Sequence, residues 1–305
     1  MIANLLTAKR VGDLKMEIGI GYCHGTFGEL VQGVINERDP FLIPLPINLY
    51  SKAIFFPQRP NREILVYDQN YKARQACQLL LNKYKIDGGG SLVVQSQLPI
   101  GKGMASSTAD IIASLRAVAS SFSLPLDEGI ISEIATKIEP TDGIMYDEAI
   151  SYDYINGKLI ETLGHIPELL LFGIDTGGFV DTQQFNQTSK NYSFQDKVLL
   201  KKAYSLVKKG LSESHVPSIF NASTISAKIN QKILPKEDFE EMEKLAETYK
   251  GGLIVAHSGT VIGILLDPNH SNIIKKKILK EMYERTGKAP FALKVLTNKK
   301  NHITK

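Results

Sequence analysis

Apolar positions along the chain follow two periodicities, and segments of the two kinds interleave without strict alternation. Spacings of three and four residues predict helices over 71–85, 106–122, 126–138, 196–209, 212–231, 236–249 and 271–286. Short apolar and β-branched runs predict strands over 17–22, 42–56, 63–67, 91–97, 169–175, 253–256, 261–266 and 292–296, with a hairpin at 253–266. This irregular order favours an α+β fold over a doubly wound parallel sheet.

Length and composition narrow the class of protein. The 305 residues are typical of two domains, which we place at 1–165 and 166–305. The net charge of +4 is too small to predict a nucleic-acid partner. Cys23 and Cys77 form neither a disulfide framework nor a metal-binding spacing, which indicates a reducing compartment. Because no apolar run approaches the roughly 18 residues of a membrane span, we expect a cytoplasmic protein with no membrane partner.

The most informative segment joins the strand at 91–97 to the helix at 106–122 and reads PIGKGMASSTA over residues 99–109. Its glycines let the backbone approach a bulky anion, and the following helix turns free N–H groups and the positive end of its dipole towards the loop. The segment therefore predicts a phosphate site, although Ser and Thr also simply begin many helices. The candidate nucleotide-binding residues are Pro99, Gly101, Lys102, Gly103, Met104, Ala105, Ser106, Ser107 and Thr108.

This loop resembles the central ATP-binding motif of the GHMP kinases, Pro-x-Gly-x-Gly-Leu-Gly/Ala-Ser-Ser-Ala-Ala, with Met104 for Leu and Thr108 for one Ala. Three further segments are similar to motifs of the L-threonine kinases in this superfamily, CHGTFGELVQG at 23–33, EPTDG at 139–143 and AHSGTVIG at 256–263. The resemblance covers about residues 17–265, and at His24 it departs from the proline usual in that branch. It implies a two-domain GHMP kinase fold, with an N-terminal domain like ribosomal protein S5 domain 2 and a ferredoxin-like C-terminal domain.

The resemblance also implies a reaction, namely ATP- and Mg²⁺-dependent phosphorylation of the hydroxyl of L-threonine, on the route to the aminopropanol linker of cobalamin. It assigns Ser107, or Ser106, and Glu139 to the metal and Asp142 to the acceptor proton. This assignment is chemically sound, since Mg²⁺ prefers a few oxygen ligands and a carboxylate can accept a hydroxyl proton. Glu133 is a competing metal ligand.

The acceptor pocket is expected to contain Glu29, Thr26, Asp142 and His257, with Glu29 holding the amino group of an amino acid. Lys102 either touches a phosphate or is solvated, and the turn at 175–178 is either a substrate wall or an ordinary turn. Two alternatives to a threonine kinase stay open. One is a kinase of another hydroxylated amino acid or alcohol, such as homoserine, serine or a secondary-metabolite precursor, and the other is a catalytically silent nucleotide-binding regulator.

Overall fold

The computed structural model describes residues 16–36, 39–58, 63–67, 70–187 and 190–297. The strands are β1 (Gly19–Ile35), β2 (Asp39–Gln58), β3 (Ile64–Val66), β4 (Gly89–Ser96), β5 (Ala149–Asp153), β6 (Lys158–Gly164), β7 (Leu170–Asp175), β8 (Gly252–Val255), β9 (Val261–Leu266) and β10 (Phe291–Lys294). The helices are α1 (Tyr71–Lys83), α2 (Ser106–Ser121), α3 (Glu128–Ile138), α4 (Thr182–Gln187), α5 (Phe194–Ser212), α6 (Val216–Gln231), α7 (Phe239–Thr248) and α8 (Asn272–Thr286).

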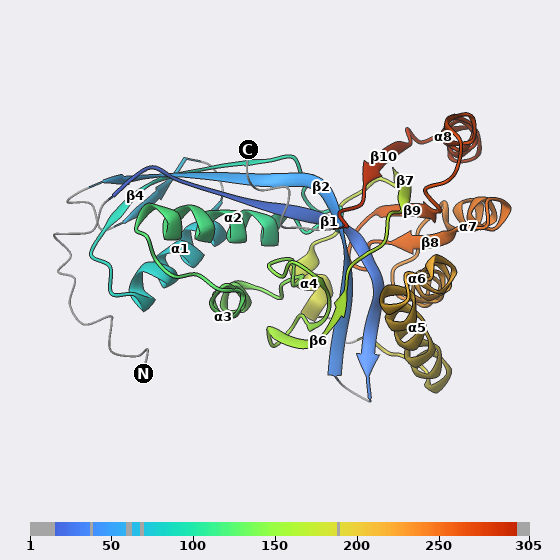
Figure 1. Ribbon diagram of the computed structural model, residues 1–305, viewed down its shortest axis with the longest axis horizontal. Coiled ribbons are helices and arrows are strands. Elements are labelled where there is room, and N and C mark those ends of the chain that lie inside the picture. Colours follow the sequence, from blue (N-terminus) through green and yellow to red (C-terminus); the bar gives the residue numbers. More distant parts are fainter. Residues whose placement is uncertain (1–15, 37–38, 59–62, 68–69, 188–189, 298–305) are drawn as a thin grey trace.

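One twisted sheet runs through the whole molecule, and the helices gather in two lobes along it (Figure 1). Its strand order is β10-β7-β9-β8-β1-β2-β4-β3, with the hairpin of β5 and β6 attached to β2. Among the described residues, the β3–β4 pair is parallel and the other pairs are antiparallel. The α+β class predicted from the sequence is confirmed, and none of the helices in the described ranges is long and apolar enough to cross a membrane.

The strands β1 and β2 extend from one lobe into the other (Figure 1). In the first lobe, α2 packs so closely on β1 that a Cβ at Gly21 would lie 2.6 Å from the backbone N of Ala117. In the second lobe, the backbone N–H of Gln32 donates to Ser226 Oγ of α6 at 3.0 Å. Both lobes therefore share β1. The boundary at residues 165 and 166 falls between β6 and β7 and stays a prediction.

The middle of β1 is irregular where it passes between the lobes. Its register against β2 shifts between His24 and Thr26, and twice more before Val31. Gly28 has a φ of +57°, and a Cβ there would lie 2.6 Å from the Cα of Ala256. Bulges of this kind re-aim side chains next to functional sites, and here they turn Glu29 towards the space between the lobes.

Most predicted elements are present, with four differences. β1 continues to residue 35 instead of ending at 22, because its bulges accommodate the glycines that suggested a loop. The β5–β6 hairpin and α4 were not predicted from the sequence. The helix expected from 212 begins at Val216, since Pro217 fits the first turn of a helix and not its interior.

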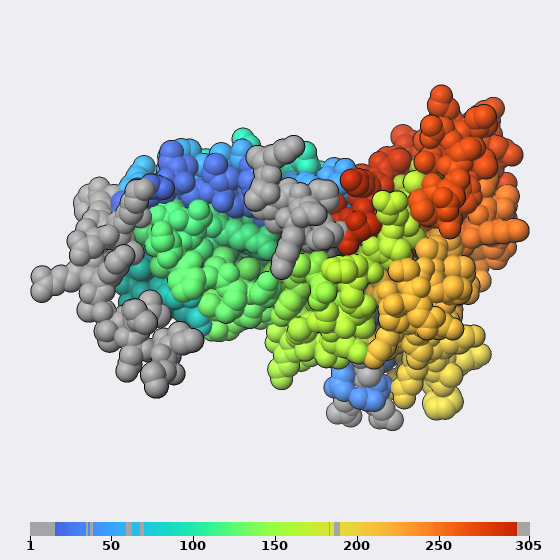
Figure 2. All heavy atoms as spheres, in the orientation of Figure 1, coloured from blue at the N-terminus to red at the C-terminus, as the bar shows by residue number. Residues whose placement is uncertain are grey.

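In Figure 2 the yellow-green segment that follows α3 fills the space between the lobes.

Candidate active site

A cavity of about 220 Å³ opens at the N-terminus of α2, between the two lobes. It is lined by residues of both halves of the chain: Glu29, Lys72, Ile100, Gly101, Gly103, Met104, Ala105, Ser106, Ser107, Thr108, Glu139, Pro140, Asp142, Tyr154, Phe179, Val180, Asp181, Thr182 and Ser258. Seven of the nine predicted nucleotide-binding residues therefore line it. Pro99 and Lys102 do not, and of the predicted acceptor residues it contains Glu29 and Asp142 but not Thr26 or His257.

The loop before α2 presents unpaired backbone donors to this cavity. The N-cap residue, Ala105, is left-handed with a φ of 60° and supplies no side-chain cap. The first N–H of α2 with a backbone acceptor is that of Ala109, which donates to the carbonyl oxygen of Ala105 at 2.9 Å. The free N–H groups and the helix dipole at residues 106–108 make this helix end suitable for phosphate oxygens.

A turn from the C-terminal half supports the loop from behind. A Cβ at Gly103, whose φ is +78°, would lie 2.8 Å from the Cα of Gly259 and still closer to the Cβ of Ala256. The backbone N–H of Thr260 donates to the carbonyl oxygen of Lys102 at 3.0 Å. Glycine is required at Gly103 both for its backbone conformation and for this close approach. The motif at 256–263 thus fixes the shape of the loop at 99–109.

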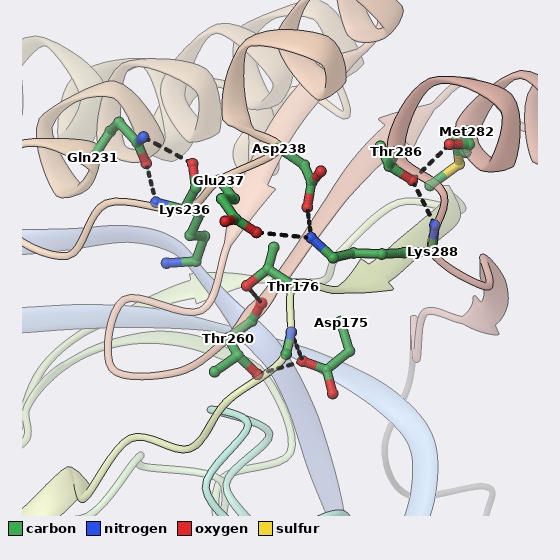
Figure 3. A network of polar contacts seen from close by, with 11 residues as sticks. Asp175, Thr176, Gln231, Lys236, Glu237, Asp238, Thr260, Met282, Thr286 and Lys288 are labelled. Carbon is green, nitrogen blue, oxygen red and sulfur yellow. Dashed lines mark hydrogen bonds and ion pairs between the residues drawn. The ribbon is translucent and has the colours of Figure 1, made fainter.

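The side chain of Lys102 points away from the cavity. Its Nζ lies 2.6 Å from Asp175 Oδ2 and donates to the carbonyl oxygen of Gly178 at 2.7 Å. Thr260 Oγ1 donates to the other oxygen of Asp175 at 2.6 Å (Figure 3). Burial opposes ionisation of Asp175, but the hydrogen bonds from Lys102 and Thr260 lower its pKa. The turn at 175–178 therefore holds Lys102 and the loop in place, beside a second, apolar cavity.

A hydroxyl and a carboxylate meet at the predicted metal position. Ser107 Oγ donates to Glu139 Oε1, and Lys72 Nζ lies 2.5 Å from Glu139 Oε2. Glu139 is placed there as the C-cap of α3, which Pro140 prevents from continuing. Glu133 is instead exposed and paired with Lys83 and Lys137, whose hydrogen bonds lower its pKa to about 2.

This donor set fits Mg²⁺. Within the described ranges no group of three or more His, Cys, Asp or Glu residues could hold a metal ion. Mg²⁺ does not require such a group, because it commonly keeps several waters and binds one or two protein oxygens together with substrate phosphates. The ammonium of Lys72 on Glu139 marks the carboxylate as a position for a cation.

Asp142 also lines the cavity and follows Glu139 by three residues in the chain. Thr108 Oγ1 donates to its Oδ2 at 3.0 Å, so the first turn of α2 orients the carboxylate. Burial and the nearby carboxylate of Glu29 raise the pKa of Asp142 to about 7, against the hydrogen bond from Thr108. A carboxylate with such a pKa can exchange a proton near neutral pH.

Glu29 is held by a buried network that joins the two halves of the chain. Its Oε2 accepts hydrogen bonds from the backbone N–H of His257 at 3.0 Å and from His257 Nδ1 at 2.8 Å. His257 Nε2 lies 2.7 Å from Ser226 Oγ. The net pKa of His257 is lowered, because the effect of burial outweighs the opposing effect of Glu29. A lowered pKa fits a neutral ring that donates from Nδ1. His257 thus positions Glu29 and does not itself face the cavity.

Sequence reasoning missed Lys72, Tyr154 and Phe179, which also line the cavity. Lys72 lies in the first turn of a helix that was predicted, but a single lysine carries no spacing signal. Tyr154 lies in the turn of the β5–β6 hairpin, which was not predicted. Phe179 belongs to the segment after β7, whose glycines suggested only a turn.

Comparison with known proteins agrees with this fold. Residues 70–151 match the family model of the GHMP kinases N terminal domain. A crystal structure of homoserine kinase from Cytophaga hutchinsonii superposes with a TM-score of 0.72 at 13% identity, covering 92% of this chain and 95% of that one. This chain is therefore similar to the GHMP kinases in fold and, over residues 70–151, in sequence.

Two curated relatives come from the L-threonine kinase branch. The L-threonine kinase of Citrobacter freundii is 29% identical over 262 residues, which cover 84% of this chain and 89% of the relative. The L-threonine kinase of Salmonella typhimurium is 27% identical over 288 residues, covering 92% and 94%. The resemblance drawn from the sequence motifs is confirmed.

Proposed function

We propose that this protein transfers the γ-phosphoryl group of Mg·ATP to the side-chain hydroxyl of L-threonine. The observation that carries the proposal is the meeting of three features in one cavity. These are the uncapped N-terminus of α2, the Ser107–Glu139 pair and the carboxylate of Asp142. Two relatives named L-threonine kinase support the choice of acceptor.

The loop and α2 bind and orient the nucleotide. The N–H groups at residues 106–108 donate to phosphate oxygens, and the helix dipole favours their negative charge. Ser107 and Glu139 would hold Mg²⁺, which supplies charge neutralisation on the phosphates when bound. Lys72, which neutralises Glu139 in this structure, exchanges that partner for the negative phosphates.

Asp142 accepts the proton of the acceptor hydroxyl. As the bond between the threonine oxygen and the γ-phosphorus forms, the bond from that phosphorus to the bridging oxygen breaks and ADP leaves. The hydroxyl proton passes to Asp142 Oδ1 or Oδ2, whose pKa of about 7 suits this transfer at neutral pH. Thr108 keeps the carboxylate aimed at the acceptor.

An amino acid fits the acceptor side because that wall of the cavity is acidic. Glu29 has one oxygen bound by His257 and directs the other towards the cavity, where it can accept a hydrogen bond from an ammonium group. Simple alcohols leave this carboxylate unpaired, which is costly in a partly buried site.

An ADP-release assay with purified protein tests the proposal. The panel is L-threonine, L-serine, L-homoserine, mevalonate and galactose, and ³¹P NMR identifies the product. We expect L-threonine to exceed L-serine by about 10-fold or more, as one methyl group in a fitted pocket allows, and to exceed the sugar and mevalonate by far more. Faster turnover of homoserine or of a simple alcohol would refute the threonine assignment. No turnover with any acceptor would favour a regulator.

A further inference from the structure

The lysines around the cavity differ in whether a carboxylate already uses their charge. Lys72 pairs with Glu139, and Lys102 pairs with Asp175 on the far side of the loop. Lys190, which lies just beyond α4, has no carboxylate partner among the described residues. A cation removed from water without a counter-charge is costly, so Lys190 gains from any anion that reaches it.

Aromatic rings hold Lys190 in place. Its Nζ lies 4.6 Å from the ring centre of Phe185 and 5.5 Å from that of Tyr154, and it donates to the Tyr154 hydroxyl over 3.4 Å. Such cation–π contacts orient an ammonium and leave its remaining donors available. Because Tyr154 is itself part of the cavity wall, this ammonium lies beside a residue of the wall.

Lys190 also lies within electrostatic reach of Glu29 on the acceptor wall. Burial lowers the pKa of Lys190 to about 8, and the carboxylate of Glu29 acts against this shift. The same carboxylate raises the pKa of Asp142, so Glu29 lies within electrostatic reach of both groups. The acceptor end of the cavity therefore has acidic groups and, beside its wall, a cation with no carboxylate partner among the described residues, which matches the two charges of an amino-acid zwitterion.

We propose that Lys190 binds the α-carboxylate of the acceptor while Glu29 binds its α-ammonium group. This inference rests on the proposed function, in that it requires an amino acid as acceptor. It assigns selectivity for a free carboxylate to a residue outside every sequence motif noted above. It also assigns the aromatic side chains of Tyr154 and Phe185 a role in presenting that lysine.

A comparison of two acceptors isolates the interaction. L-Threonine and L-threoninamide share the hydroxyl and the ammonium group, but the amide has no negative charge. In the unmodified enzyme we expect kcat/KM to favour L-threonine. In Lys190→Met, which keeps most of the apolar stem, we expect this preference to fall about 10- to 100-fold, as for a lost hydrogen bond between charged groups. The KM for ATP and turnover of threoninamide change little.

Lys236 offers a matched control. It is a second buried lysine that Glu29 acts on, with a pKa lowered by burial to about 8. Its ammonium hydrogen-bonds Asn230, which is not part of the cavity wall, whereas Lys190 contacts Tyr154, which is. Lys236→Met should leave the ratio of the two acceptors unchanged whatever it does to stability. Lys190→Arg should retain most of the preference, which guards against a folding defect in the methionine variant.

The outcomes separate the inference from the proposed function. If the unmodified enzyme turns over neither L-threonine nor its amide, the proposed function fails first. If L-threonine is a good substrate and Lys190→Met lowers both acceptors equally, or leaves both unchanged, the assignment of Lys190 is overturned and the threonine kinase stands.

Discussion

Replacement of Gly103 by alanine tests whether the turn at 256–260 shapes the phosphate loop. Two costs add at this position. An L-residue with a φ near +78° loses about 1–2 kcal/mol. The new methyl group would lie 2.8 Å from the Cα of Gly259 and closer to Ala256, and overpacking of this kind costs about 1–3 kcal/mol. We expect Gly103→Ala to lower the free energy of unfolding by about 2–5 kcal/mol.

Two other glycines separate these contributions. Gly287 ends α8 with a φ of +69° and has nothing within 4 Å of a built Cβ, so Gly287→Ala carries the conformational cost alone. Gly259 has an ordinary φ, but its Cβ would collide with the backbone of Lys102 and Gly103, so Gly259→Ala carries the contact cost alone. Gly287→Ala is expected to cost less than Gly103→Ala.

Urea unfolding gives the midpoints and slopes, and calorimetry with Mg·ATP gives the affinities. Gly103→Ala and Gly259→Ala should both weaken nucleotide binding, whereas Gly287→Ala should leave it intact because α8 is remote from the cavity. If Gly103→Ala is no less stable than Gly287→Ala and binds Mg·ATP normally, the turn does not support the loop and the argument fails.

Three further predictions concern charged side chains. Glu139→Gln should lower kcat sharply with partial recovery at high Mg²⁺, while Glu133→Gln should not, as an ADP-release assay across a Mg²⁺ titration will show. Asp142→Asn should lower kcat by about 10²–10⁴-fold with ATP affinity unchanged. Because the folded-state pKa of Asp142 is raised from 3.8 to about 7, its ionisation destabilises the fold increasingly as pH rises from about 4 to 7, so thermal unfolding of Asp142→Asn should show a relative gain at pH 8 over pH 4. Lys102→Met should lower stability by at most about 1 kcal/mol. It should leave the calorimetric ATP affinity nearly unchanged, because the backbone hydrogen bond from Thr260 to the Lys102 carbonyl still holds the loop.

Each of these has a clear contrary result. Equal losses of kcat in Glu139→Gln and Glu133→Gln would refute the assignment of Glu139 as the metal-binding carboxylate. A pH-independent difference in melting temperature would show that Asp142 keeps an ordinary pKa. A large loss of ATP affinity in Lys102→Met would mean that its side chain turns into the cavity when nucleotide binds.

The sequence predicted the loop and helix start at 99–109 well because local signals agree there, while phosphate binding by this loop stays a prediction. Glycines, hydroxyl residues and the start of an apolar-periodic helix all lie within residues 99–109, and α2 begins at Ser106 as expected. Glu139, assigned to the metal from the resemblance, contacts Ser107 at the end of α3, but its role as a ligand stays a prediction.

Features that depend on contacts between distant segments could not be predicted in this way. The glycines of β1 suggested a loop, but pairing with β2 keeps the segment in the sheet through three register shifts. The strand β6 has mostly exposed residues and no clean alternation of apolar and polar positions. The aromatic side chains around Lys190 come from two separate segments, the β5–β6 turn and α4, so no local pattern reveals them.

The pairing of β1 with β8 has a consequence for the order of events during synthesis. Glu29 leaves the ribosome early, but the residues that hold it, Ser226 and His257, are made more than 190 positions later. The phosphate loop likewise waits for Gly259. When the whole first lobe has left the ribosome, the loop at 99–109 still lacks its supporting turn. The carboxylate of Glu29, which is buried in the folded protein, is then still exposed to water. Competence to bind Mg·ATP should arise late and abruptly, when β8 and the following turn emerge and dock.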